Sequence, residues 1–424
     1  MIMSDGLRCL KLGGSIPALV EQNRDHLCSA AVLPCFLYDA DTVLRQSRAA
    51  LKAVGANADV YYAAKANGIR PMISATLSAG LGLDVSSEEE LREALRVGCP
   101  PDRIILTGPG KSDEILRSAI AARVGLIAVE SLREAARLSS IAAAVGIRQE
   151  VLLRTSPDIA PAFESANQPG FHSFAGKSVK FGFDEGQLQG VMPDLLGLSG
   201  IHIRGLHVFF ASGVLDISAY REILRLSLEL FERVSVDSGL PLDTLDLGGG
   251  WGLDFETGRT LDIADLEHTL LHLKSGRKRS PARLLFEPGT YVAGPSGVYC
   301  ARIVDVKDSR GEIFGIVDGG FCDLLRAAIV GSHDITICDL GGREQPAACK
   351  RLVREIQIAG NSCHPLDVLC GRISVAIDAL DELVDALVIV ANCGAYGESF
   401  ALRTFQGKAR PKRYWYSNSD LKSI

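Results

Sequence analysis

The feature that most constrains the fold is a strand-and-helix unit that repeats between Val60 and Gly289. In each unit, a short apolar run ends in small or polar residues and is followed by a segment with helix start and stop signals. Eight runs fit the strand pattern, at residues 60–65, 81–86, 104–108, 126–130, 151–156, 205–210, 244–249 and 284–289. Eight strand-then-helix units predict an α/β fold, the TIM (β/α)8 barrel.

The pattern changes after about Val298. From there, strand-like runs follow one another without helical segments, at residues 301–306, 313–320, 335–340, 354–360, 373–377 and 386–394. A further strand candidate at 35–40 and a helix at 41–55 precede the barrel. We therefore expect a barrel over residues 39–297 and a C-terminal all-β domain, a β-sandwich or β-barrel, built from residues 298–424 together with 1–38.

Composition excludes several classes of protein. Of the 424 residues, 47% are apolar, and 45 basic against 51 acidic side chains give a net charge of −6. This is ample apolar material for a core, and an acidic balance disfavours a nucleic-acid partner. The eleven cysteines form no CxxC pair, the start is not a signal peptide, and no apolar stretch is clean enough to span a bilayer. We expect a cytoplasmic protein without a membrane partner.

Reactive or flexible residues lie at the C-terminal ends of the predicted strands, where barrel enzymes place their chemistry. They are Lys65, Asp84, Arg154, the run Gly248, Gly249 and Gly250, and Glu287 before Pro288 and Gly289. Small neighbours of Lys65, Ala64 and Ala66, leave room for a planar ligand. A lysine in a desolvated pocket is a candidate nucleophile toward an aldehyde, and pyridoxal phosphate is the obvious aldehyde.

The glycine run offers backbone N–H groups that could hold a phosphate, although a plain turn is an alternative. It is not a dinucleotide fingerprint, because Leu253 stands where the third glycine should be. His268 and His272 are spaced as helical metal ligands, but no metal motif surrounds them, so we expect no metal.

Six motifs carry a resemblance to a known family. YYAAKAN (61–67), LGLDVSSEEEL (81–91), SVKFGF (178–183), LDLGGGWG (245–252), FEPG (286–289) and CGAYGESF (393–400) resemble the fold-type III pyridoxal-phosphate decarboxylases, the diaminopimelate, ornithine and arginine decarboxylase family. The similarity runs in order from about residue 35 to 411. It implies an alanine-racemase-like fold, pyridoxal 5'-phosphate as cofactor, and a head-to-tail homodimer with active sites shared between subunits.

The resemblance also implies residue roles. Lys65 would be the Schiff-base lysine, with Asp84 nearby, and Glu287 would face the pyridine nitrogen and keep it protonated, which favours decarboxylation over racemisation. Arg154 would contact the phenolic-oxygen side of the cofactor, with a rim salt bridge as the alternative. The remaining predicted cofactor contacts are Ser212, Gly248, Gly249, Gly250, Gly289 and Tyr396, although Tyr396 could instead be a core residue of the β domain.

A second set of roles falls in the C-terminal half. Cys363, in GNSCHPLDVL (360–369), resembles the family cysteine that a partner subunit contributes, where it would protonate Cα after CO2 leaves; an inert cysteine is the alternative. Asp367 and Tyr396 are predicted to lie at the substrate, and Lys180 is predicted to pair with Asp367 between subunits unless it is merely solvated.

The sequence departs from the family pattern in ways that bear on the substrate. Phe209 replaces the histidine that stacks on the cofactor ring, with His207 two residues earlier, and Thr290 replaces an arginine expected near the phosphate. Arg326 resembles an arginine that grips a substrate carboxylate, although a surface arginine is the alternative. His364 replaces an acid that pairs with a distal ammonium, which disfavours diamino acids as substrates.

These features predict a pyridoxal-phosphate-dependent L-amino-acid decarboxylase of unusual substrate choice. The Cys-His-Pro sequence at 363–365 and FQGKARP (405–411) resemble the family members of secondary metabolism, including those that act on carrier-protein-bound aminoacyl groups. The basic, aromatic segment 408–416 could bind an acidic carrier protein or be a solvated end. A racemase on the same scaffold and a non-catalytic regulator like the antizyme inhibitors remain the alternatives.

Overall fold

The computed structural model describes residues 8–56, 58–159, 171–330, 333–339, 352–402 and 404–424. They form two compact units. The barrel unit comprises Val43–Leu253 and Thr260–Val292, and the β unit comprises the described residues of Met1–Thr42, Asp254–Arg259 and Ala293–Ile424. The loop Asp254–Arg259 joins the β unit because the backbone oxygen of Phe255 accepts hydrogen bonds from Asn392 and from the amide of Asp334.

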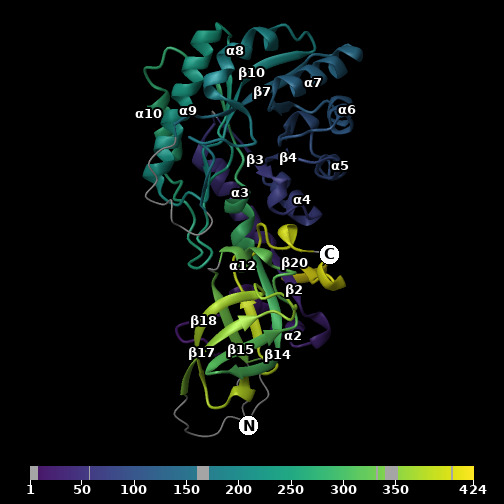
Figure 1. The fold of residues 1–424 in the computed structure, drawn as a ribbon, viewed down its shortest axis with the longest axis vertical. Helices are drawn as coiled ribbons and strands as arrows, with labels where there is room; N and C mark the ends of the chain where they lie inside the picture. The colour runs from purple at the N-terminus through teal and green to yellow at the C-terminus, as the bar shows by residue number, and fades with distance from the viewer. Residues whose placement is uncertain (1–7, 57, 160–170, 331–332, 340–351, 403) are drawn as a thin grey trace. The chain divides into compact units, whose positions relative to one another are not determined.

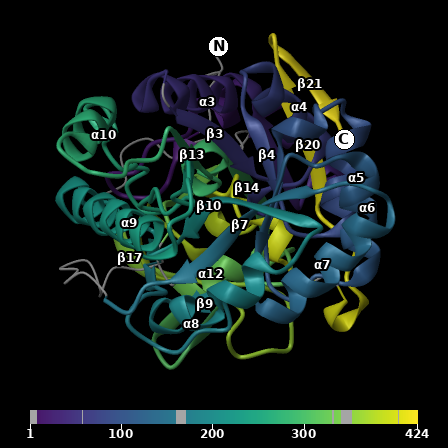
Figure 2. The same ribbon diagram turned by 90° about the horizontal axis from the view of Figure 1, so that it is seen from above.

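Within the described residues of the barrel unit, eight parallel strands close into a barrel (Figure 2). They are β3 (Ala58–Ala63), β4 (Gly82–Val85), β5 (Ile104–Leu106), β6 (Leu126–Val129), β7 (Gln149–Ser156), β10 (Ile201–Val208), β12 (Thr244–Asp246) and β13 (Arg283–Phe286). Each pairs with the next in this order, and β13 pairs with β3. The barrel predicted from the repeating strand-and-helix units is confirmed.

Helices surround the strands (Figure 2). They are α3 (Ala40–Val54), α4 (Arg70–Ser78), α5 (Glu88–Arg96), α6 (Asp113–Ala122), α7 (Leu132–Ala144), α8 (Glu185–Leu196), α9 (Ile217–Ser238) and α10 (Leu266–Lys274). The hydroxyl of Ser87 caps α5 by accepting the amide of Glu90 at 3.2 Å, a contact worth about 1 kcal/mol. The Glu90 carboxylate accepts the amide of Ser86 at 2.7 Å, one residue earlier than in a regular capping box.

The barrel interior is a packed core. Its cluster of buried side chains is Tyr61, Ile105, Leu126, Leu152 and Leu285, each from a different strand. Burying such side chains supplies most of the stabilisation, at about 25 cal/mol per Å² of apolar area. Because this core fills the barrel, the residues that follow the strands are free to form a site at its carboxyl end.

The β unit contains a ten-stranded sheet within the described chain (Figure 1). Its strands are β1 (Arg8–Cys9), β2 (Cys35–Asp39), β14 (Gly297–Ser309), β15 (Glu312–Val317), β16 (Ile335–Asp339), β17 (Leu352–Ala359), β18 (Val368–Ile377), β19 (Leu387–Val390), β20 (Lys412–Ser417) and β21 (Asp420–Ser423). The N-terminal strands enter this sheet, β1 beside β16 and β2 between β14 and β20.

Helical segments also belong to the β unit. Two short helices, α1 (Ala18–Gln22) and α2 (Arg24–Leu27), place Val20 and Leu27 in the same core as Cys35 and Cys300. A further helix, α12 (Leu325–Val330), follows β15, where the sequence pattern showed only strands. The ten described cysteines carry free thiols. None of the helices in the described part of the chain is long and apolar enough to cross a membrane.

Candidate active site

Lys65 lies just beyond the end of β3, not on the strand itself. The strand ends at Ala63, and one 3-10 turn, Ala64–Ala66, carries the lysine. Both flanking alanines are buried, whereas 42% of the Lys65 side chain is exposed. Its ammonium forms an ion pair with the fully buried carboxylate of Asp84 on β4. Asp84 is fixed in turn by the hydroxyl of Thr107, which donates at 2.6 Å, so the lysine amine is held at the carboxyl end of the barrel.

Glu287 follows β13 and is buried among polar groups from neighbouring strands. Polar atoms of Glu287, Asp246 on β12 and His207 on β10 all lie within 4.8 Å of one another. Burial, and then the charges of Asp246 and Asp84, raise the pKa of Glu287 well above its usual value. Within the described residues, Glu287 Oε1 has no hydrogen-bond partner. A buried oxygen without a donor marks a place where a ligand N–H could bind.

His207 was not predicted to be a cofactor contact, yet it points into this cluster. It is 2% exposed, and its Nε2 lies 3.9 Å from Glu287 Oε2. Burial, helped by the positive charges of Arg154, Lys65 and Lys111, lowers its pKa well below the usual value, so the imidazole is neutral. Phe209 is partly exposed, and its ring packs on Phe174 with centroids 5.2 Å apart.

The glycine run is required by close packing as well as by backbone geometry. Gly248 and Gly250 have positive φ angles of 62° and 84°. A Cβ on Gly248 would lie 2.6 Å from the ring of Phe209, and one on Gly249 would lie 2.5 Å from the backbone oxygen of Glu287. The run therefore folds tightly over the barrel rim, and the described chain supplies no acceptor for the N–H groups of Gly249 and Gly250.

Arg154, on β7, forms the rim salt bridge that was the alternative to a cofactor contact. Its Nη1 lies 2.7 Å from Glu130 Oε1, and its guanidinium carbon lies 4.4 Å from the ring centroid of Phe181. The other oxygen of Glu130 accepts the amide of Gly182 at 3.0 Å. Arg154 and Glu130 thus attach the KFG segment, residues 180–182, to the barrel. A direct cofactor contact of Arg154 stays a prediction.

Three further predicted positions lie on short elements of the barrel unit. Ser212 is half-buried on β11 (Ala211–Ser212), which pairs with β8 (His172–Ser173). A Cβ on Gly289 would lie 2.9 Å from the Cβ of Ala66, so glycine lets this turn pack against the one that carries Lys65. Thr290 begins the short helix α11 (Thr290–Ala293).

In the β unit, the exposed Cys363 lies in a loop that Asp367 holds in place. Asp367 is 3% exposed, and its carboxylate accepts the amides of Phe321 at 2.7 Å and Ser362 at 3.0 Å. A Cβ on Gly360 would lie 2.1 Å from Asp367 Oδ1. This geometry favours a positioning role for Asp367 over direct contact with the substrate. Its predicted pairing with Lys180 stays a prediction.

His364, beside the cysteine, stands in an aromatic cluster. Its ring stacks on Phe321 with centroids 5.4 Å apart, and Phe405 meets it edge-on at 6.2 Å. Because His364 Nδ1 accepts the amide of Leu366 at 3.2 Å, a neutral ring carries its proton on Nε2. His364 therefore offers a hydrogen-bond donor and no negative charge.

Arg326, on α12, is a partly buried cation that lies against aromatic rings. Its guanidinium carbon lies 3.7 Å from the ring centroid of Phe255 and 5.5 Å from that of Tyr396. Burial lowers its pKa to about 10, which leaves it charged at neutral pH. Within the described residues, no carboxylate forms an ion pair with Arg326, which is the condition expected of an anion-binding side chain.

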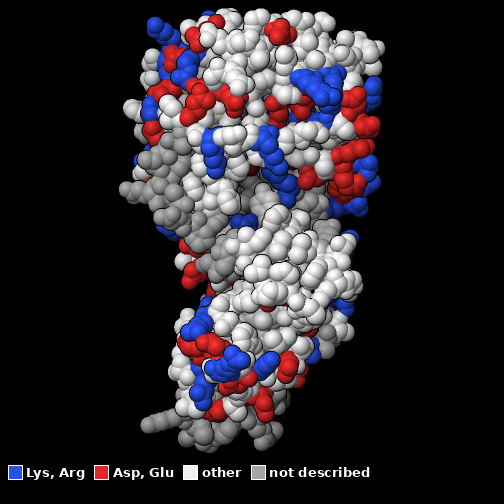
Figure 3. Space-filling view, in the orientation of Figure 1, with Lys and Arg blue, Asp and Glu red and all other residues white. Residues whose placement is uncertain are grey.

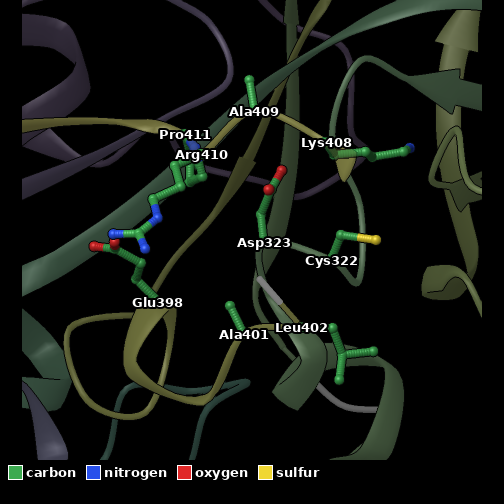
Figure 4. Close-up of a pocket in the computed structure, with 9 residues that line it drawn as sticks. All are labelled: Cys322, Asp323, Glu398, Ala401, Leu402, Lys408, Ala409, Arg410 and Pro411. Carbon is green, nitrogen blue, oxygen red and sulfur yellow. The ribbon is translucent and has the colours of Figure 1, made fainter. Parts of the chain in front are cut away.

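A second buried acid, Asp323, lies near the Cys363 loop. Figure 4 shows it in a small pocket with Cys322, Glu398 and Lys408. The hydroxyl of Tyr299 donates to Asp323 Oδ2 at 2.7 Å, and burial raises the pKa of Asp323 to about 6. The pocket lies between Cys322 and Asp323, which precede α12, and residues of the C-terminal segment from Glu398 to Pro411.

Comparison with known proteins places these features in a family. Residues 40–294 match the family model described as "Pyridoxal-dependent decarboxylase, pyridoxal binding domain". The chain is 29% identical over 402 residues to diaminopimelate decarboxylase of Aquifex aeolicus, covering 92% of this chain and 88% of that protein. It is also 29% identical over 385 residues to the L-glutamyl-[BtrI acyl-carrier protein] decarboxylase of Niallia circulans, covering 89% and 87%.

A solved structure shows the same fold. Diaminopimelate decarboxylase of Helicobacter pylori, crystallised in complex with L-lysine, superposes with a TM-score of 0.80 at 23% identity and covers 95% of each chain. The chain belongs to the pyridoxal-dependent decarboxylases, and its cofactor is pyridoxal phosphate.

The barrel unit fits that cofactor. The structure brings together an amine at the barrel mouth, a buried carboxyl oxygen without a donor, and glycine N–H groups that point to no protein acceptor in the described chain. These are the groups needed to hold an aldehyde, a ring nitrogen and a phosphate. His207 and Asp246 are the residues that sequence reasoning missed. Asp246 could have been found from the sequence, because it is an acidic residue within an apolar strand pattern. An acid in such a position is rarely buried without a partner.

Proposed function

We propose that this protein removes the α-carboxylate of an L-amino acid as CO2, with pyridoxal phosphate held at the carboxyl end of the barrel. The observation that carries the proposal is the presence, at one barrel mouth, of the Lys65–Asp84 pair and the buried Glu287, whose Oε1 has no hydrogen-bond partner in the part of the chain that the structure describes. The matched family model and the relatives named above are decarboxylases, which favours decarboxylation over racemisation and over a purely regulatory role.

When bound, the cofactor supplies a ring that accepts the electron pair left at Cα. Lys65 would hold it through the aldehyde carbon, and Asp84 would orient the lysine. Glu287 would accept a hydrogen bond from the ring nitrogen and favour its protonated form. The phosphate would bind to residues 248–250 and Ser212, while Phe209 would cover one face of the ring.

Cys363 is proposed to deliver the proton that Cα needs after CO2 leaves. Its thiol is exposed on a loop that the buried Asp367 stabilises. A group that must reach into another subunit has to be exposed in this way. We infer a head-to-tail homodimer in which this loop completes the active site of the partner.

The surface of the β unit supports the dimer. Figure 3 shows a broad area on this unit where charged side chains are sparse. Large apolar side chains near the Cys363 loop and the segment 398–405 are exposed, with exposed fractions of 67% for Leu366 and 53% for Phe400. Exposed apolar side chains of this size are typical of a protein interface.

The substrate is proposed to carry an uncharged or anionic group at its far end, such as a carboxylate, an amide or a carrier-linked acyl group. Arg326 offers a cation without a carboxylate partner in the described chain, and His364 offers an N–H donor and no negative charge. A distal ammonium would be desolvated without a negative partner, which is costly. This favours a substrate like that of the Niallia circulans relative over a free diamino acid.

The experiment is a product assay on the purified holoenzyme. Free and carrier-loaded amino acids are incubated with the enzyme, and the products are identified by mass spectrometry. A product that keeps its α-carboxylate would reveal a racemase. We expect the His364→Glu variant to shift the kcat/KM ratio toward diamino acids by about tenfold, equivalent to about 1.4 kcal/mol. Preferential turnover of a diamino acid by the wild-type enzyme would refute the proposed substrate class.

A further inference from the structure

Two buried carboxyl groups meet where the cofactor ring is proposed to lie. Asp246 is fully buried at the end of β12, and Glu287 is 6% exposed just after β13. The two strands are parallel neighbours, which places the two side chains beside each other. Polar atoms of the two side chains lie within 4.8 Å of each other, and a hydrogen bond between two carboxyl groups would require one shared proton.

The two oxygens of Asp246 have different surroundings. Oδ1 accepts the backbone amide of Gly248 at 2.8 Å. Oδ2 has no hydrogen-bond partner within the described residues, and neither has Glu287 Oε1. Oδ1 is therefore committed as an acceptor, which leaves Oδ2 as the oxygen that can carry a proton.

The positive groups around this pair have partners of their own. Lys65, after β3, pairs with Asp84 on β4; Arg154, on β7, pairs with Glu130; and the buried Lys111 pairs with Glu134 at 2.8 Å. The neighbouring His207, on β10, is neutral. Two ionised carboxylates would thus lie together in the interior without a cation between them, an arrangement that burial strongly disfavours.

We propose that Asp246 carries the shared proton in the holoenzyme and donates a hydrogen bond from Oδ2 to Glu287, so that Glu287 alone holds the negative charge that faces the ring nitrogen. Asp246 is then a positioning residue, and its proton remains on it throughout. The inference rests on the proposed role of Glu287.

The behaviour of the two acids without cofactor is consistent with this arrangement. Burial raises the pKa of both acids, that of Asp246 to about 6, which favours a protonated form of the pair. A cationic ring N–H next to Glu287 stabilises the charged form of Glu287 and so favours the proton on Asp246.

The test compares Asp246→Asn with Asp246→Ala in the holoenzyme. Asparagine can accept from Gly248 through its oxygen and donate to Glu287 through its amide, so it reproduces the protonated acid. With 15N-labelled cofactor, we expect the ring-nitrogen chemical shift of Asp246→Asn to stay in the protonated range and the cofactor dissociation constant to stay within about threefold of wild type. In Asp246→Ala we expect the shift to move toward the deprotonated value and the dissociation constant to rise about tenfold, or 1.4 kcal/mol.

The proposal is overturned if Asp246→Asn loses the ring proton, which would show that Asp246 acts as an anion, or if Asp246→Ala leaves both readouts unchanged. Glu287→Gln separates this failure from that of the proposed function, because an unchanged nitrogen signal there would show that Glu287 does not face the ring. Thermal unfolding of each variant checks the fold, and Asp246→Ser, which cannot reach Glu287, replaces an alanine variant that does not fold.

Discussion

At the scale of single residues, Cys363 combines an exposed thiol with a neighbour, Ser362, whose backbone amide donates to Asp367. If this thiol protonates Cα, Cys363→Ala should lower kcat by about 100-fold, in the range of general acid catalysis. It should also lower the ratio of amine formed to CO2 released, because misplaced protonation gives other products.

The control for this prediction is Cys28→Ala, which removes an exposed cysteine outside the loop. Both products are quantified in one reaction, CO2 by release and amine by mass spectrometry. Equal kcat and an equal product ratio in wild type and Cys363→Ala would contradict the assigned role.

At the scale of elements, the loop 360–367 depends on one buried carboxylate. Asp367→Ala leaves the amides of Phe321 and Ser362 without their acceptor, and each unsatisfied buried group costs about 1–3 kcal/mol. We expect faster hydrogen exchange in this loop and a free energy of unfolding lowered by about 2 kcal/mol or more.

Lys180→Ala is the matched comparison, since Lys180 is the predicted ionic partner of Asp367 between subunits. If the backbone contacts dominate, Lys180→Ala leaves hydrogen exchange in the loop near wild type. If it reproduces the Asp367→Ala pattern, the ion pair is the main role of Asp367.

Elements that depend on local pattern were predictable from the sequence. The strand-and-helix units and the β2 strand follow from apolar spacing and helix signals, and all of them form. The turn that carries Lys65 was read as a strand because AAK continues an apolar run. Helix α12 was missed because a helix of six residues has too little periodicity to detect.

The candidate site was predictable only in part, for a related reason. Residues within recognisable motifs, such as Lys65 and Glu287, could be named from the sequence. The meeting of His207, Asp246 and Glu287 depends on the register of β10, β12 and β13 around the closed barrel, which no local pattern encodes. The same holds for the aromatic cluster around His364, which joins segments distant in sequence.

At the scale of the whole molecule, stability should depend on pH through Asp323. Burial raises its pKa from 3.8 to about 6, so the folded protein binds this proton more tightly than the unfolded chain. Stability from this group is therefore full below pH 4 and is lost as the pH rises to about 6. Relative to wild type, Asp323→Asn should gain about 2 kcal/mol in free energy of unfolding between pH 4 and pH 7.

Denaturant titrations of both proteins across this range measure the difference, with the exposed Asp420→Asn as control. A difference that does not change with pH would show that Asp323 ionises equally easily in the folded and unfolded chains.

Shared active sites make a second prediction for the whole molecule. Lys65→Ala and Cys363→Ala should each be nearly inactive alone, because each lacks one half of every site. Dissociated and reassociated in equal amounts, they should recover about one quarter of wild-type activity, since half of the dimers are mixed and each mixed dimer holds one intact site. No recovery, with mixed dimers verified by mass, would place both residues within one subunit's site.

The most direct test of the central claim is to find which lysine holds the cofactor. The holoenzyme is reduced with borohydride, digested and sequenced by mass spectrometry, with Lys65→Arg as the variant that keeps the charge beside Asp84. If Lys65 holds the cofactor, we expect a pyridoxyl group on Lys65 in the wild type and none in the variant. A pyridoxyl group on another lysine, or cofactor that binds but leaves no labelled peptide after reduction, would contradict this claim.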